Sequence, residues 1–257
     1  MIRFRIKEHL IIPFGRPKWD ISKIRLISVS TVATHFESDT PCVHIDKTKD
    51  EAIRFEDFPF VFPETEKLPD IDNPIHAFDF ACEYIKTDCN LQTPSERLFL
   101  DLYAQYCKEV ITPHHYALKQ RKREELSPPW NDDDWVFAAL IPLPQAHLYL
   151  EDPLKEPSFT DEPSFTLDQV MVKVDFAFWD GKRIIAVEVD GGSHIGSEKH
   201  IRKDRLLSRA GVETIHIHNS ELKNHGTKVI CRLLPTQITK FWEGIKFCHN
   251  PLKKFPF

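Results

Sequence analysis

Two apolar runs with strand-like patterning dominate the C-terminal half of the chain. Residues 172–178 and 183–189 are rich in β-branched and aromatic side chains. Between them lies Trp179-Asp180-Gly181-Lys182, and an Asp-Gly pair is a strong signal for a two-residue hairpin turn. The pattern therefore predicts a β-hairpin, with Trp179 paired to Lys182.

A helix and another strand are predicted directly after this hairpin. Ser197 is typical of a helix N-cap and Gly211 of a helix end, which predicts a helix over 197–210. Residues 212–218 are again β-rich. The order strand, hairpin, strand, helix, strand implies a right-handed crossover between the last two strands.

Upstream, the clearest helix signal is at Thr93-Pro94-Ser95-Glu96. A threonine N-cap, proline at the first helical position and glutamate three residues after the cap are typical of a helix start. Leu98, Leu102 and Tyr106 then recur every four residues and predict a helix over 94–107. Another helix is expected at 74–86.

The first 65 residues predict a small β-rich module. Short extended segments are predicted at 1–6, 24–29, 42–45 and 58–62, and proline residues lie between most of them. The Pro- and Asp-rich stretch 63–74 is typical of a boundary. Residues 135–142 are interpreted as a buried strand, and the near-repeat at 151–168 as a loop insertion.

The hairpin pattern also predicts an acidic face. With Asp180-Gly181 as the turn, Asp175 lies opposite Ala186, and side chains alternate between the two faces. One face then carries Lys173, Asp175, Ala177, Ile184, Ala186, Glu188 and Asp190. The other face is entirely apolar and is expected to be core.

Three carboxylates on one face repel one another unless a cation is present. Mg²⁺ prefers oxygen ligands and keeps several waters, so it suits such a cluster. In the alternative interpretation, Asp175 makes only a local hydrogen bond, while Glu188 and Asp190 lie at a solvated strand end.

Composition favours a globular cytoplasmic protein without a membrane span. Hydrophobic residues make up 41% and charged residues 28% of the chain. No apolar run approaches the roughly 18 residues that a span requires, and the stretch 10–14 is too short for a signal peptide. The six cysteines show no C-x-x-C pair, so we expect reduced thiols.

The net charge of −5 is unevenly distributed. Residues 195–257 hold 12 Lys/Arg and 5 Asp/Glu, whereas residues 1–194 hold 22 and 34. A basic region beside an acidic metal site suits a polyanionic substrate. A basic, solvated helix and tail would explain the asymmetry equally well.

The acidic pattern and its surroundings resemble a nuclease superfamily. The relevant motifs are Val174-Asp175-Phe176, Glu188-Val189-Asp190-Gly191-Gly192-Ser193-His194, Asp204-Arg205 and the helix start at 93–96. Over residues 91–225 they are similar to the PD-(D/E)xK (restriction-endonuclease-like) superfamily, and most closely to its very-short-patch-repair (Vsr)-like branch. The resemblance implies an α/β fold in which helices flank a central mixed sheet. We expect an accessory module at 1–90, a nuclease domain at 91–247 and a tail at 248–257.

The resemblance also implies roles for the acidic residues. Asp175 and Glu188 would bind the metal together with Asp190, which stands where the superfamily often has a lysine. Lys173, Lys199 or Lys203 could supply the missing cation. These three acids, with Glu96 and His194, are the expected catalytic residues.

Glu96 and His194 have simpler interpretations as well. Glu96 corresponds to the helix-borne acid of the family, but it is equally consistent with a capping box. His194 would act as general base or contact the phosphate, or it is an ordinary loop histidine. His216 and His218, two residues apart on one strand, lack an evident third ligand and are interpreted as structural.

Several polar residues are expected to contact nucleic acid: Lys199, Arg202, Lys203, Arg205, Arg209 and Gln145. Arginines on one helix are good phosphate contacts, although such arginines often simply face solvent. DNA is therefore the expected partner.

Taken together, the sequence predicts a Mg²⁺-dependent endodeoxyribonuclease, in which Mn²⁺ can substitute and water is the nucleophile. A role in phage defence or a mobile element fits this activity. The first alternative is a catalytically silent nucleic-acid-binding or sensing module. The second is a nuclease subunit that docks a protein partner through residues 1–90, and homo-oligomerisation is compatible with all three.

Overall fold

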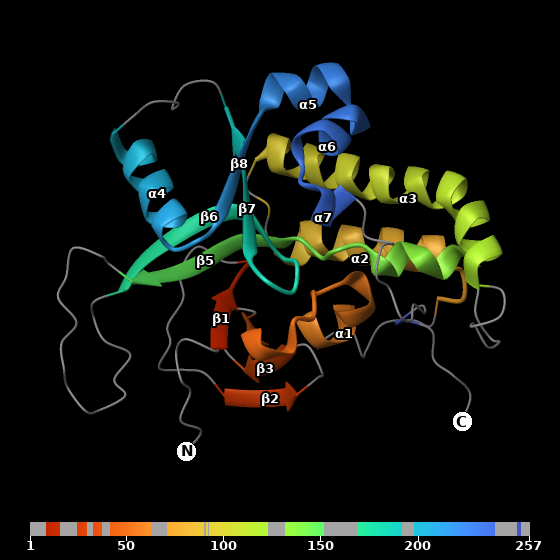
Figure 1. Ribbon diagram of the computed structural model, residues 1–257, viewed down its shortest axis with the longest axis horizontal. Helices are drawn as coiled ribbons and strands as arrows, with labels where there is room; N and C mark the ends of the chain where they lie inside the picture. Colours follow the sequence, from red (N-terminus) through yellow and green to blue (C-terminus); the bar gives the residue numbers. More distant parts are fainter. Residues whose placement is uncertain are drawn as a thin grey trace.

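The computed structural model describes residues 9–15, 25–29, 33–37, 42–62, 71–89, 91, 93–122, 132–151, 169–191, 198–239 and 251–252. This part of the chain is a mixed α/β structure with two four-stranded sheets and flanking helices (Figure 1). None of its helices is both long enough and apolar enough to cross a bilayer.

The larger region is organised around a mixed sheet in the order β5-β6-β7-β8. Its strands are β5 (Leu143–Glu151), β6 (Gln169–Trp179), β7 (Ile184–Asp190) and β8 (Glu213–His218). The pairs β5–β6 and β6–β7 are antiparallel, whereas β7–β8 is parallel. Helix α4 (Glu198–Arg209) connects the parallel pair. The predicted strand, hairpin, strand, helix, strand order is confirmed.

The predicted hairpin turn is wrong in length. Trp179 pairs with Ile184 and Ala177 with Ala186, so the loop spans 180–183 instead of two residues. Asp180 stabilises this wider loop, because its Oδ1 accepts hydrogen bonds of 2.8 Å from the backbone N–H groups of Lys182 and Arg183. The register shifts by two residues, and since side chains alternate with period two, the predicted faces are retained.

The apolar face of the sheet packs against α3 (Pro94–Lys122). Phe99 lies 4.8 Å from Phe176 and Tyr103 lies 5.4 Å from Phe178, measured between ring centroids. The predicted end at residue 107 is wrong, because the helix continues through the charged segment 119–122 to Lys122. Lys, Arg and Gln are good helix formers, so the charged composition there does not end a helix.

The other helices lie around this core. Helices α5 (Asn219–His225), α6 (Thr227–Leu233) and α7 (Thr236–Thr239) lie on the same side as α3, and α4 lies on the opposite side of β7 and β8 (Figure 1). Helix α2 (Pro74–Asp88) packs beside α3, close to the predicted range 74–86.

The N-terminal region contains the predicted β-rich structure as an antiparallel sheet in the order β1-β4-β3-β2. Its strands are β1 (His9–Pro13), β2 (Arg25–Val29), β3 (Ala33–Glu37) and β4 (Cys42–Asp46). Two predicted strands are confirmed, and the segment 1–6 lies outside the described residues. The strand predicted at 58–62 is wrong: this is helix α1 (Phe58–Val61), where Pro59 fits the first turn because it needs no intrahelical N–H bond there.

The buried strand predicted at 135–142 is also wrong. Residues Asp132–Ala138 form a 3-10 helix, and Leu140 makes only an isolated bridge to Arg54. A short apolar run cannot be assigned to a strand or a buried helix from periodicity alone. The strand of this region, β5, begins at Leu143, and the loop insertion expected at 151–168 falls almost wholly outside the described residues.

The N-terminal segment is joined to the larger sheet by backbone and side-chain contacts. Trp179 Nε1 donates to the Glu51 carbonyl at 2.8 Å, Ile53 N donates to the Trp179 carbonyl, and Gly15 N donates to the Pro144 carbonyl. One continuous hydrophobic core includes residues from both regions. The domain boundary at residue 90 stays a prediction, and apolar packing crosses it.

This junction explains the need for glycine at position 181. A Cβ atom there would lie 2.7 Å from the Asp50 carbonyl oxygen, and the backbone φ is +96°. We expect Gly181→Ala to lower the free energy of unfolding by about 2 kcal/mol or more, because the left-handed conformation alone costs roughly 1–2 kcal/mol. Gly211→Ala is the matched control, since φ is +74° and nothing lies within 4 Å. The free energy of unfolding of both variants is measured by urea denaturation. Equal decreases for Gly181→Ala and Gly211→Ala would mean that the close approach to Asp50 adds nothing to the cost of a side chain at position 181.

Candidate functional site: a carboxylate–lysine centre beside an Asp/His cluster

Asp175 and Glu188 come together on the two central strands. The register Ala177–Ala186 and Phe176–Val187 continues toward Asp175 and Glu188, which share the predicted face. Asp175 Oδ2 accepts a 2.8 Å hydrogen bond from the Val189 backbone N–H. This is the local hydrogen bond of the alternative interpretation, and it holds the carboxylate beside Glu188.

Glu188 is buried and pairs with a lysine from the crossover helix. Its side chain is 8% exposed, and its Oε1 lies 2.5 Å from Lys203 Nζ. Burial raises the pKa of Glu188 to about 7; the Lys203 charge lowers the pKa and the Asp175 charge raises it. Burial is also the main cause that raises the pKa of Asp175. Both carboxylates therefore hold protons more strongly than they would in water, and a bound cation would stabilise their ionised forms.

Glu96 and Gln145 form a buried support next to Asp175. Thr93 Oγ1 accepts a 3.2 Å bond from the Glu96 backbone N–H, which confirms the predicted cap. The Glu96 side chain is also buried, and its Oε2 accepts a 2.9 Å bond from Gln145 Nε2. The negative charge of Glu96 also contributes to the raised pKa of Asp175.

The backbone at Gln145 is unusual. Its neighbours pair in register as Ala146–Val174 and Pro144–Phe176, so Gln145 is the β5 residue opposite Asp175. Its φ is +50°, a left-handed conformation that is uncommon for a residue other than glycine and that occurs at functional sites. Gln145 is only 2% exposed, so its observed role is to hold Glu96, and a contact with nucleic acid stays a prediction.

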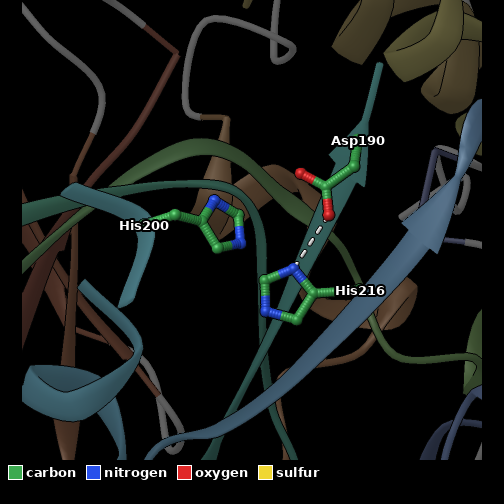
Figure 2. Close-up of side chains that lie close together, drawn as sticks. All are labelled: Asp190, His200 and His216. Atoms are coloured by element: carbon green, nitrogen blue, oxygen red, sulfur yellow. Dashed lines mark hydrogen bonds and ion pairs between the residues drawn. The ribbon is translucent and has the colours of Figure 1, made fainter. Parts of the chain in front are cut away.

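A second cluster lies immediately beside Glu188 and consists of Asp190, His200, Asp204 and His216. His216 pairs with Glu188 in the parallel register of β7 and β8. Its Nδ1 lies 2.9 Å from Asp190 Oδ2, and its Nε2 lies 3.3 Å from Asp204 Oδ1. Figure 2 shows the carboxylate of Asp190 and the rings of His200 and His216 converging from three elements. One ligand atom from each of these three residues lies within 4.8 Å of the others.

The sequence motifs did not identify this cluster. His216 was interpreted as structural, and His200 had no expected role. The usable signal was the His200–Asp204 spacing of four on a crossover helix, which places both side chains on one helix face. Asp190, predicted as a third ligand beside Asp175 and Glu188, hydrogen-bonds to His216, and its role as a metal ligand stays a prediction.

The remaining predicted residues fall into three groups. Arg202, Arg205 and Arg209 are exposed on α4, whereas Lys203 of the same helix is partly buried. Lys173 is half-buried, and its charge lowers the pKa of Asp175. His194 and the side chain of Lys199 lie outside the described residues.

Comparisons of the chain with protein-family models, with curated proteins and with solved structures found no match. The geometry of the two clusters is therefore the basis for any functional assignment.

Proposed function

We propose that the chain is a metal-dependent nuclease of the restriction-endonuclease-like type, which hydrolyses DNA phosphodiester bonds with water as the nucleophile. One observation carries this proposal: the Lys203 ammonium lies 2.5 Å from the buried carboxylate of Glu188, next to Asp175. Two neighbouring carboxylates can hold a divalent ion that activates water, and a nearby lysine charge can bind a phosphate. The order of the sheet strands and the crossover helix are compatible with this class of fold.

The donor atoms at Asp175 and Glu188 fit a hard divalent ion. Both residues offer carboxylate oxygens, the ligands that Mg²⁺ and Mn²⁺ prefer, and both are held in place by contacts from β7 or α4. When bound there, such an ion would lower the pKa of a water molecule and neutralise charge that develops on the phosphate. Glu96, held by Gln145, would orient water or supply a further oxygen.

Lys203 supplies the positive charge that the superfamily's lysine is expected to supply. Asp190 occupies the sequence position where that lysine often stands, but its carboxylate bonds to His216. The ammonium group of Lys203 approaches the same carboxylate pair from helix α4. Because its side chain is 24% exposed, it can also contact a bound phosphate.

The exposed face of α4 is the proposed nucleic-acid contact. We expect replacement of Arg202, Arg205 and Arg209 together by alanine to weaken binding to every DNA sequence alike. Each lost phosphate contact should reduce the slope of log affinity against log salt by about 1. Fluorescence anisotropy with a labelled duplex at several salt concentrations measures this slope. Lys223→Ala on α5, an exposed cation away from α4, is the control, and an unchanged slope in the triple variant would exclude α4 as the contact.

The activity itself is tested with supercoiled, linear and single-stranded DNA and with RNA, each in Mg²⁺, Mn²⁺ or EDTA. Metal-dependent cutting of a DNA substrate supports the proposal, and cutting of RNA alone would change the substrate class. Folded protein that binds DNA and cuts nothing would favour the silent binding module. A partner captured by the full chain and required for cutting would favour the subunit alternative.

A further inference from the structure

We propose that Asp190, His200 and His216 form a second metal site, which binds a divalent transition-metal ion of the zinc type. In this arrangement Asp204 lies on the other side of the His216 ring and fixes its orientation. The site adjoins the carboxylate–lysine centre, which consists of Asp175, Glu188 and Lys203. It uses different residues, and zinc binding there does not depend on nuclease activity.

The first support is the position of the side chains. Asp190 ends β7, His216 lies on the neighbouring parallel strand, and His200 and Asp204 face them from the helix that connects these strands. One ligand atom from each of Asp190, His200 and His216 lies within 4.8 Å of the other two. Two ligands of one zinc ion are at most about 4 Å apart, so a small side-chain movement brings all three onto one ion.

The hydrogen-bonding chemistry of His216 is the second support. It has a carboxylate at each ring nitrogen: Asp190 at Nδ1 and Asp204 at Nε2. A neutral imidazole has only one N–H, so one of these carboxylates faces a nitrogen without a proton. A metal ion at Nδ1 removes this conflict, because it binds both the ring and Asp190 and leaves the Nε2–H for Asp204, whose Oδ1 lies 3.3 Å away. Metal-binding histidines commonly donate their second N–H to a carboxylate in this way.

Charge balance points in the same direction. The rings of His200 and His216 lie 4.8 Å apart, so protonating both to balance Asp190 and Asp204 would place two like charges side by side. A divalent ion balances the two carboxylates while both histidines remain neutral. The group is also accessible, since the side chains of His200, Asp190 and His216 are 17%, 14% and 30% exposed.

Ligand type decides the class of metal. Imidazole nitrogen suits Zn²⁺ and neighbouring transition metals, whereas Mg²⁺ and Ca²⁺ prefer oxygen alone. An ion at this position would link β7, α4 and β8, and α4 carries the Lys203 that pairs with Glu188. Its expected role is to fix this helix against the sheet.

The test is zinc binding by the full chain after chelator treatment and removal of the chelator. We expect one Zn²⁺ per chain with a dissociation constant on the order of micromolar or tighter. His200→Ala and His216→Ala should each weaken binding at least 100-fold, and Asp204→Asn about 10–100-fold as expected for an orienting carboxylate. His76→Ala, an exposed histidine on α2, should leave zinc affinity within about twofold, since it supplies no ligand to the ion. Unchanged affinity in both histidine variants, or no binding by the wild-type chain, would overturn the proposal.

A measurement on the wild-type protein guards against variants that fail to fold. With ¹⁵N-labelled histidine, Zn²⁺ should shift the ring nitrogens of two of the 13 histidines, and the two rings should be in contact by NOE. Shifts of no ring, or only of rings that are far apart, would also overturn the proposal. Because zinc binding is measured without nucleic acid and cleavage is measured separately in Mg²⁺ or Mn²⁺, failure of the nuclease and failure of the zinc site are distinguishable.

Discussion

Glu188→Gln should abolish metal-dependent DNA cleavage, with a loss of about 1,000-fold or more. Glutamine keeps the size of the side chain and can still accept a hydrogen bond from Lys203. It removes the negative charge that would bind a divalent ion beside Asp175. It also removes the ion pair that holds the Lys203 ammonium at the site. The measurement is the initial rate of nicking of supercoiled DNA at saturating Mg²⁺ or Mn²⁺, with a thermal melt to verify folding.

The matched control is Glu109→Gln, which neutralises an exposed glutamate that bonds to Gln105 on helix α3. Its cleavage rate should equal that of the wild-type protein. Equal cleavage by Glu188→Gln would exclude the carboxylate–lysine centre as the active site. Activity that persists at one level in every variant would instead indicate a contaminating nuclease.

The acidic face was predictable from sequence because it depends only on local alternation. The turn length was wrong, yet Asp175 and Glu188 still share a face, since an error of two residues in register preserves the side-chain direction. The helix start at Thr93 was predictable for a similar reason, because capping involves residues only three apart. Local patterns therefore located one half of the candidate site.

The other half depends on contacts between distant segments. His216 reaches Asp190 only because β8 pairs in parallel with β7, in a register that no short pattern specifies. The partner of Glu96 could not be inferred either, because Gln145 adopts a left-handed backbone conformation that its residue type does not predict. The assignment of 58–62 as a strand failed because an apolar run of that length fits a strand or a buried helix equally well.

The lysine prediction is the most informative of these distant contacts. Lys199, Lys203 and Lys173 were all candidates, and their spacing could not separate them. Among the lysine side chains that the structure describes, the ion pair with Glu188 favours Lys203, whose charge also lowers the pKa of both Glu188 and Asp175. Lys203 is therefore expected to control how much of Glu188 is ionised at neutral pH.

Glu188 consequently gives the metal-free protein a definite pH dependence. Its pKa is raised from 4.5 to about 7 in the folded protein. A carboxyl group with a raised pKa favours folding most at low pH, and this contribution is lost as pH rises through about 7. Metal binding requires the ionised form, so Mg²⁺ or Mn²⁺ affinity should rise about tenfold per pH unit below that value and then level off.

Lys203→Met should move this transition to higher pH and reduce cleavage at pH 7 by about 100-fold. Methionine keeps an unbranched apolar chain but removes the charge, so the pKa of Glu188 rises further and less of the carboxylate is available to a metal ion. Loss of a cation near the phosphate should account for the rest of the decrease, at roughly tenfold or more. Lys203→Arg, which keeps the charge, should retain a wild-type pH profile. The measurement is manganese affinity and cleavage rate from pH 5.5 to 9. If Lys203→Met and Lys203→Arg lose cleavage activity equally, and neither shifts the pH profile, Lys203 acts through packing alone.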